Sequence, residues 1–145
     1  MSVEELEAAF GHRDEIRVPR GVHRGHFLAW LDNPSARQKR WRWPQRAGFQ
    51  WTPFGVDFDR NLWFFFTPAV AMGRFEARVE RSRWRGTDAV VLRYERSRLP
   101  LAFRRILYDE VKPLDDGLVL GIGGSNAGRG RGDHFFFALE RDRRD

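Results

Sequence analysis

The stretch from Tyr108 to Arg141 constrains the fold more than any other part of the chain. It contains three runs rich in β-branched and aromatic residues, and the segment Asp115-Asp116-Gly117 separates the first two. An Asp-Gly pair between such runs is among the strongest short-range signals for a β-hairpin. A longer glycine-rich connection, residues 121–132, separates the second run from the third. The stretch therefore predicts three successive antiparallel strands.

Similar short runs between turn signals fill most of the remaining chain. The run 73–81 is the clearest, because Phe75, Ala77 and Val79 alternate with charged side chains, as in a strand with one face in water. About eight such runs follow one another at a spacing of roughly 8–12 residues, which is typical of an all-β sandwich or barrel. They cover residues 22–31, 49–58, 62–67, 73–81, 89–96, 103–112, 118–121 and 134–141.

Two further segments favour helices. Ser2 is a suitable N-cap, and Glu5 completes a capping box at the start of a short helix over residues 2–11. Residues 35–43 are basic and compatible with a helix that ends at Pro44. We expect this second helix to act as a flap over one end of a barrel.

Together these elements predict a single domain over residues 1–145 with an all-β fold. The expected architecture is an antiparallel up-and-down meander that closes into a roughly eight-stranded barrel, with a short N-terminal helix and a helical flap. The helix and its connector would take residues 1–20, the barrel residues 21–141 and a polar tail residues 142–145. Closure removes exposed strand edges, and a barrel of this size can hold one small ligand.

The composition excludes several classes of site. The chain has no cysteine, so disulfides, thiolate metal sites and cysteine nucleophiles are excluded. Its formal net charge is +6 and is carried almost entirely by arginine. Such a charge is found in proteins that bind nucleic acid or anionic surfaces, and also where composition alone favours arginine.

No targeting or membrane segment is predicted. The first thirty residues lack the apolar centre of a signal peptide, and no run approaches the roughly 20 apolar residues of a membrane helix. We therefore expect a cytoplasmic protein without a membrane span. The sequence gives no prediction of the oligomeric state.

A basic segment with two tryptophans is the strongest candidate for a nucleic-acid site. Its cations would neutralise phosphates and its indoles would stack on bases. The alternative is the flap described above, whose tryptophans cover the barrel mouth while its arginines face water. We favour the flap and do not expect nucleic acid as a partner. The candidate residues are Lys39, Arg40, Trp41, Arg42 and Trp43.

Glu110 is the candidate catalytic residue. It shares one strand face with Tyr108, and we expect that face to point into the barrel together with Leu92 and Tyr94. A carboxylate in an apolar interior has a raised pKa and can act as an acid or a base, while a tyrosine beside it can polarise a carbonyl. In the alternative interpretation, Glu110 lies at the barrel rim and pairs with an arginine.

The barrel interior predicts a site for a small apolar or aromatic molecule, since ligand sites are mostly apolar with a few polar groups. The expected lining residues are Trp51, Trp63, Phe65, Phe75, Arg93, Tyr94, Tyr108, His134 and Phe137. No metal or other cofactor is expected. The odd spacing of His23 and His26 puts them on opposite strand faces, and the glycine-rich connection lacks the lysine and the helix of a nucleotide site.

Several short motifs follow one another in a characteristic order. They are Trp51–Asp59, Gly73–Phe75, Arg85-Gly86, Tyr108–Glu110, Asp116–Gly121 and Phe135–Arg141. In this order they resemble uncharacterised bacterial lipocalin-like domains, including the group called GXWXG/DUF4334. The resemblance implies a calycin-type barrel and marks Trp51, Asp57, Tyr108 and Asp109 as positions of interest without giving them roles. The chain departs from the group at Val56, where a lysine would stand, and it contains no Gly-x-Trp-x-Gly.

Three functions remain as hypotheses. The first is a lipocalin-like barrel that binds a small apolar or aromatic ligand. The second is an isomerase, cyclase or dehydratase that uses Glu110 with Tyr94 or Tyr108. The third is a module that binds nucleic acid or an anionic surface through residues 37–46.

Overall fold

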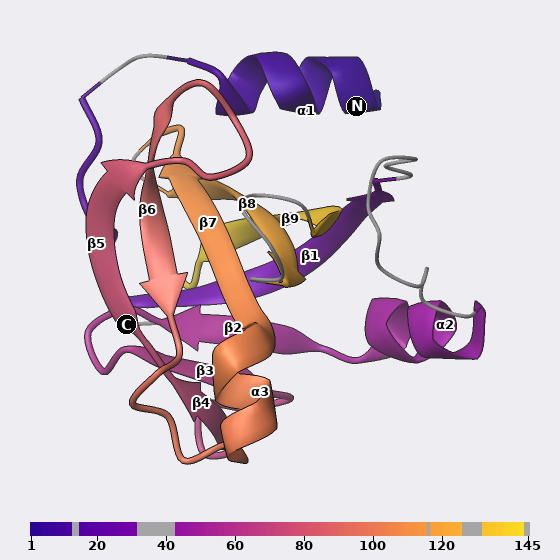
Figure 1. Ribbon diagram of the computed structural model, residues 1–145, viewed down its shortest axis with the longest axis vertical. Coiled ribbons are helices and arrows are strands. Elements are labelled where there is room, and N and C mark those ends of the chain that lie inside the picture. Colours follow the sequence, from indigo (N-terminus) through magenta and orange to yellow (C-terminus); the bar gives the residue numbers. More distant parts are fainter. Residues whose placement is uncertain (13–14, 32–42, 116, 126–131, 144–145) are drawn as a thin grey trace.

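The computed structural model describes residues 1–12, 15–31, 43–115, 117–125 and 132–143, which form three helices and nine strands (Figure 1). The helices are α1 (Val3–Phe10), α2 (Trp43–Trp51) and α3 (Leu101–Ile106). The strands are β1 (Val22–Trp30), β2 (Phe54–Asp57), β3 (Leu62–Phe65), β4 (Ala71–Arg74), β5 (Glu76–Arg81), β6 (Asp88–Arg93), β7 (Leu107–Pro113), β8 (Leu118–Ser125) and β9 (Asp133–Arg141).

The nine strands make one antiparallel sheet with the order β4-β3-β2-β1-β9-β8-β7-β6-β5. Every hydrogen-bonded pair joins strands that are consecutive in the chain, except that β1 pairs with β9. The two edge strands β4 and β5 are separated only by Phe75, so the chain itself joins the edges of the sheet. The sheet thereby curls into a nearly closed barrel (Figure 1).

The barrel interior is filled mainly by aromatic and β-branched side chains. Its buried core comprises Phe54, Val56, Phe58, Phe75, Val90, Leu92, Tyr94, Val111, Val119, Phe135, Phe137 and Leu139. Several phenylalanine rings pack over a glycine on the neighbouring strand. Gly121 pairs directly with Phe137, and a Cβ at Gly121 would lie only 2.1 Å from that ring. The rings occupy the space that a side chain on the facing strand would need.

The outer face of the barrel carries a second core under α1. Leu6 and Phe10 of α1 pack with Leu120, Ile122 and Phe136. The helix begins at a complete capping box, in which the Ser2 hydroxyl accepts from the Glu5 amide and the Glu5 carboxylate accepts from the Ser2 amide. The N-terminal helix predicted from the sequence is therefore confirmed.

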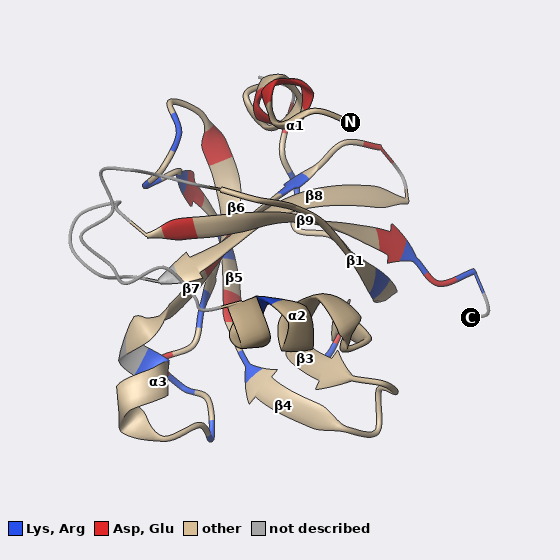
Figure 2. Cartoon of the chain, turned by 90° about the vertical axis from the view of Figure 1, so that its right-hand side faces the viewer, with Lys and Arg blue, Asp and Glu red and all other residues tan. Residues whose placement is uncertain are grey.

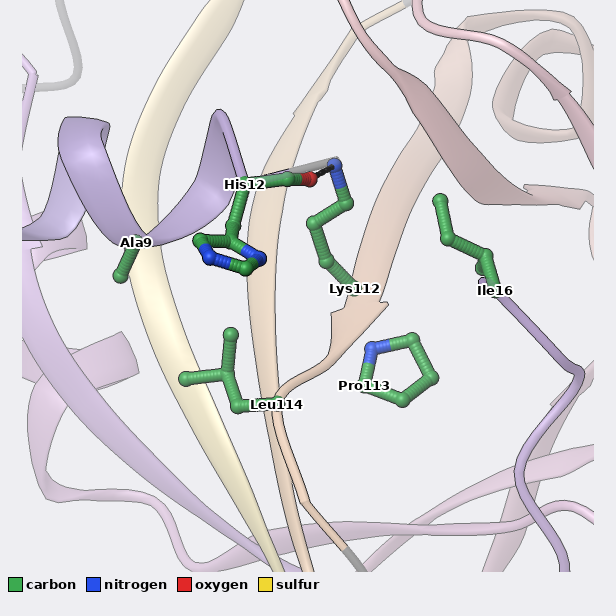
Figure 3. A pocket seen from close by; sticks show the side chains of 6 residues that line it. All are labelled: Ala9, His12, Ile16, Lys112, Pro113 and Leu114. Atoms are coloured by element: carbon green, nitrogen blue, oxygen red, sulfur yellow. Dashed lines mark hydrogen bonds between the residues drawn. The ribbon is translucent and has the colours of Figure 1, made fainter. Parts of the chain in front are cut away.

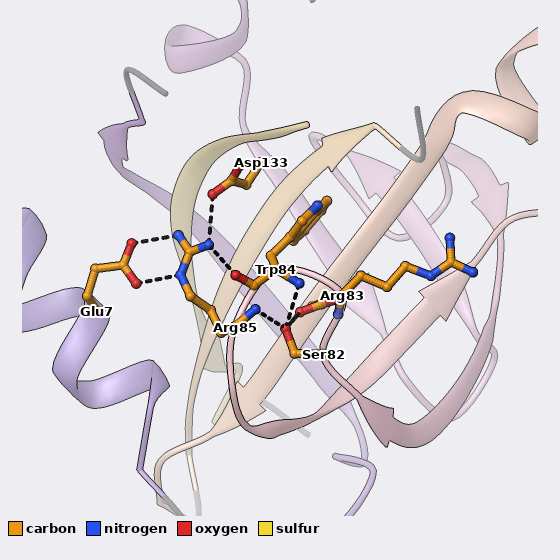
Figure 4. Close-up of polar contacts among 7 residues, drawn as sticks. Glu7, Ser82, Arg83, Trp84, Arg85 and Asp133 are labelled. Carbon is orange, nitrogen blue, oxygen red and sulfur yellow. Dashed lines mark hydrogen bonds and ion pairs between the residues drawn. The ribbon is translucent and has the colours of Figure 1, made fainter. Parts of the chain in front are cut away.

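The connection over residues 82–87, between β5 and β6, folds over the same outer face (Figure 4). Arg85 ties it to its surroundings, since its guanidinium binds the Glu7 carboxylate at 2.5 and 2.6 Å and the Asp133 carboxylate at 2.9 Å. These contacts join α1, the connection and β9. The barrel wall next to them is consequently buried on both faces.

The predicted all-β barrel is confirmed, with nine strands in place of about eight. Several predicted bounds were wrong. The run predicted as one strand over residues 73–81 is divided at Phe75 between β4 and β5, and β8 continues to Ser125, into the connection predicted over residues 121–132. Residues 49–51 belong to α2, and Pro44 lies in its first turn, where a proline is favoured, instead of ending a helix. Residues 103–106 belong to α3, so β7 begins four residues later than expected. Apart from Trp43, the predicted helical flap lies outside the described residues.

None of the helices in the described parts of the chain is long and apolar enough to cross a membrane.

Candidate functional site

A cavity of about 380 Å³ opens at the end of the barrel where α2 and α3 lie. Its wall is almost entirely apolar and is built from both helices, the strands β2, β3, β4, β7, β8 and β9, and the connection between β6 and α3. The lining residues are Phe49, Phe54, Trp63, Phe65, Met72, Gly73, Tyr94, Leu99, Phe103, Leu107, Asp109, Gly124 and Phe135. Asp109 is the acidic member of this set.

Asp109 and Tyr94 form a hydrogen-bonded pair on the cavity wall. Asp109 lies opposite Leu92 in the β6–β7 register, so it points into the barrel with Leu92 and Tyr94. The Tyr94 hydroxyl donates a hydrogen bond to Oδ2 of Asp109. The amide of Gly124 donates a second one to the same carboxyl group. The pair is thus held by two neighbouring strands and the segment that follows β6.

The surroundings change the acidity of both groups. Burial raises the pKa of Asp109 to about 7, although the hydrogen bonds from Tyr94 and Gly124 lower it in part. Burial and the charge of Asp109 raise the pKa of Tyr94 well above its ordinary value. The Tyr94 hydroxyl therefore stays protonated at neutral pH and acts as a hydrogen-bond donor. Asp109 is poised between its protonated and ionised forms, so it can either donate or accept.

Trp63, which also lines the cavity, buries a third polar atom beside this pair. Its indole Nε1 is buried near the Tyr94 hydroxyl and makes no hydrogen bond of good geometry within the part of the chain that the structure describes. A buried donor of this kind costs free energy until an acceptor reaches it. The cavity wall is therefore apolar apart from one carboxyl group and the phenol bonded to it, and the indole N–H lies buried behind the wall.

No protein-family model and no curated protein matches this chain. A crystal structure of a protein from Thermomonospora curvata is similar to it, with a TM-score of 0.53 over 99% of this chain and 89% of that one. The two sequences are 17% identical. What they share is the fold.

Glu110 and Tyr108 do not face this cavity, contrary to the expectation from the sequence. In the β6–β7 register Glu110 lies opposite Val91 and Tyr108 opposite Arg93, on the outer face of the sheet. Leu107 begins β7 and points inward, so Asp109 and Val111 point inward as well. The inner face of this strand is therefore shifted by one residue from the predicted one. Such a shift moves every side chain of a strand to the opposite face.

Glu110 is fully buried in a polar cluster beneath the connection over residues 82–87. The Ser82 hydroxyl and the Arg83 amide donate to its carboxylate, the latter at 2.6 Å. The Tyr108 hydroxyl donates to Oε1 at 2.8 Å. Trp84 packs edge-on against the Tyr108 ring at 5.0 Å. Both residues thus hold the connection in place and are not exposed to a ligand in the barrel.

The other predicted lining residues divide into three groups. Trp63, Phe65 and Tyr94 line the cavity. Phe75 and Phe137 belong to the interior core but not to the cavity wall. The remaining predicted residues, Trp51, Arg93 and His134, do not line it.

These last three residues have other surroundings. Trp51 is 85% exposed at the end of α2. Arg93 binds the Glu80 carboxylate at 2.7 Å on the outer face. His134 lies next to Phe135, whose side chain points inward, and so belongs to the outer face of β9.

The basic tryptophan segment is only partly described. Trp43 begins α2 and is exposed, whereas Lys39, Arg40, Trp41 and Arg42 lie outside the described residues.

Asp57, a position marked by the family resemblance, caps a turn by accepting hydrogen bonds from the amides of Asp59 and Arg60.

Asp109 is a site residue that the predicted strand faces did not include. It stands between Leu107 and Val111, and an acidic residue at the centre of an apolar alternation is the signal that identifies it. The family resemblance had marked this position without giving it a role.

A second pocket of about 350 Å³ lies where the end of α1 meets the end of β7 (Figure 3). The buried Lys112 ammonium donates to the His12 carbonyl and to the Thr87 hydroxyl, each at 2.5 Å. These bonds join three segments of the chain and give Lys112 a structural role. No group of three or more His, Cys, Asp or Glu side chains suitable for a metal ion occurs among the described residues.

Proposed function

We propose that this barrel binds a small apolar or aromatic molecule that carries an oxygen acceptor, such as a carbonyl or hydroxyl group. The observation that supports it is an apolar cavity of about 380 Å³ whose wall includes the Asp109–Tyr94 pair. Ligand sites of small-molecule binders combine a largely apolar wall with a few fixed polar groups. The cavity has both features.

The polar groups also define which ligand atom fits. Protonated Asp109 offers a hydrogen-bond donor on the cavity wall, so a ligand oxygen can accept from it. The aromatic rings of Phe49, Phe54 and Phe135 provide flat apolar contacts for the remainder of the molecule. A flat, mostly hydrocarbon molecule with one carbonyl or hydroxyl group satisfies both requirements.

Filling the cavity from Gly73 tests the proposal. A Cβ at this glycine would make ordinary contacts, 3.5 Å from Leu99 Cδ1 and 3.7 Å from the Tyr94 ring. The longer side chain of Gly73→Leu then occupies the cavity without a backbone clash. We expect the affinity for a neutral, environment-sensitive naphthalene ketone to fall about tenfold or more, since the ligand loses apolar contact area on the order of one side chain. Fluorescence titration measures this affinity.

Gly86→Leu is the matched control, because a Cβ at Gly86 meets nothing within 4 Å and the residue does not line the cavity. This variant should bind the probe as the unmodified protein does, and circular dichroism should report the same fold for both variants. Equal affinities of Gly73→Leu and Gly86→Leu would contradict binding in this cavity.

An enzyme acting on the same cavity is the second candidate function. The catalytic groups of such an isomerase, cyclase or dehydratase would be Asp109 and Tyr94, because Glu110 lies on the outer face. A carboxyl group with a pKa of about 7 is well matched to proton transfer at neutral pH. Catalysis predicts that Asp109→Asn loses turnover of an enolisable carbonyl compound while it retains affinity. Unchanged turnover would reject this candidate and leave binding alone.

Nucleic-acid binding through residues 37–46 stays a prediction, since Trp43 is the one described residue of its candidate set.

A further inference from the structure

Exposed apolar side chains lie on the elements that line the cavity and on the connection between β3 and β4. Met72 and Phe103 line the cavity and yet are 47% and 55% exposed, so the apolar wall continues onto the outer surface. Further exposed apolar residues stand on the same elements: on α2, on the β3–β4 connection and on α3. We call this surface the rim, and it consists of Trp51, Phe66, Met72, Leu101, Phe103 and Ile106.

The charges of these elements have one sign. The segments 43–56, 60–75 and 96–107, which carry the rim, contain no Asp or Glu, although the chain has 20 acidic residues. They contain several arginines, and Figure 2 shows α2, β3, β4 and α3 in tan and blue. Arg60 and Arg96 pair with acidic groups of neighbouring segments. Arg74 and Arg98 are exposed on the same segments and contribute positive charge there.

We propose that the rim docks onto the surface of an anionic lipid bilayer. Tryptophan and phenylalanine side chains settle at the boundary between headgroups and hydrocarbon, and nearby arginines attract anionic headgroups. An exposed apolar surface on segments that carry arginines and no acidic residue is complementary to this kind of partner. The docked cavity would open toward the lipid, so that an apolar ligand could enter it without crossing water.

Docking and ligand binding are separable. The docking surface depends on the exposed rim, whereas only the direction of ligand transfer rests on the proposed function. Gly73→Leu should therefore lose the naphthalene probe and still bind vesicles. If the probe fails to bind the unmodified protein while vesicles do, the proposed function fails and the docking surface remains.

Leu101→Glu tests the docking surface directly. Leu101 is 57% exposed, does not line the cavity and is the first residue of α3, where an acidic side chain favours the helix. The variant should therefore fold, and circular dichroism checks that it does. Sedimentation of the full chain with vesicles of phosphatidylcholine and phosphatidylglycerol should show about tenfold weaker binding, because an apolar contact is lost and a like charge faces the lipid.

Leu114→Glu is the matched control. Leu114 follows the far end of β7, away from α3, and is also exposed. It should bind anionic vesicles as the unmodified protein does. Vesicles of phosphatidylcholine alone should bind both proteins weakly, since the attraction of the arginines is then missing. Trp51→Ala supplies a second rim variant without a change of charge, and it should also weaken binding.

Four outcomes would overturn the proposal. The unmodified protein does not sediment with anionic vesicles, or Leu101→Glu and Leu114→Glu bind them equally well. The protein is a dimer that Leu101→Glu converts to monomers, which would assign the rim to a second copy of the chain. The protein binds single-stranded DNA through the same arginines more tightly than it binds vesicles, which would assign the rim to nucleic acid.

Discussion

Asp109→Asn is expected to stabilise the folded protein above pH 7 by up to about 4 kcal/mol. Burial raises the pKa of this carboxyl group from 3.8 to about 7, and each pH unit corresponds to about 1.36 kcal/mol. The folded state therefore disfavours the ionised form. Asparagine carries no charge, and its carbonyl can still accept the hydrogen bond from Tyr94.

The sign of the effect follows from the protons bound in each state. In the unfolded chain Asp109 loses its proton near pH 4, whereas in the folded protein it keeps the proton until about pH 7. Between these values the folded state binds more protons, so the contribution of Asp109 to stability falls as the pH rises. Below pH 4 both states are protonated, and Asp109→Asn should have little effect.

Urea unfolding of both proteins across this pH range measures the difference. The stability gained by Asp109→Asn should grow from near zero in acid to a plateau above pH 7. Asp88→Asn is the matched control, since this carboxylate is 62% exposed and pairs loosely with Arg81 at 3.7 Å. A gain from Asp109→Asn that does not change with pH would show that Asp109 is not buried as described.

Glu110→Ala is expected to have the opposite effect and to destabilise the protein by about 3–5 kcal/mol. The Ser82 hydroxyl, the Arg83 amide and the Tyr108 hydroxyl all donate to this carboxylate, which is fully buried. Truncation leaves these donors without their acceptor and opens a void beneath the connection over residues 82–87. A buried donor that loses its acceptor is left without a hydrogen bond, and its desolvation then lowers the stability of the folded state.

Urea unfolding measures the loss, and Glu95→Ala is the control because that carboxylate is 72% exposed. The folded fraction of Glu110→Ala should still bind the naphthalene probe with unchanged affinity, since Glu110 is on the outer face. A mild loss of stability combined with a lost affinity for the probe would place Glu110 inside the barrel after all. Two neighbours in sequence, Asp109 and Glu110, are thus expected to give effects of opposite sign.

The barrel was predictable because its hairpins carry strong local signals. Asp115 accepts from the amides of Gly117 and Leu118 in the turn between β7 and β8, as an Asp-Gly turn should. The alternation of β5 was equally clear, since its outer face carries charged residues such as Glu76, Arg78 and Glu80. Such patterns depend only on neighbouring residues and on water at one face.

The site was harder to predict because the barrel is buried on both faces beside α1. Tyr108 and Glu110 lie under the connection over residues 82–87, so their face of β7 is as buried as the inner one. Alternation can then define two faces without telling which is inside. Which face of β7 points inward depends on where the strand begins, and it begins at Leu107, directly after α3. The end of α3 is determined by tertiary packing, which local sequence patterns do not predict.

Where a glycine lies under a phenylalanine ring of the neighbouring strand, the ring fills the space that a side chain at the glycine would occupy. At Gly121 an added methyl group would overlap Phe137, whereas a smaller residue at Phe137 alone would leave a hole. Substitutions at the two positions are therefore compensating and not independent. In relatives of this chain, the glycine should be replaced only where the facing ring is replaced too. The two positions, which are not neighbours in the sequence, would then covary among the relatives.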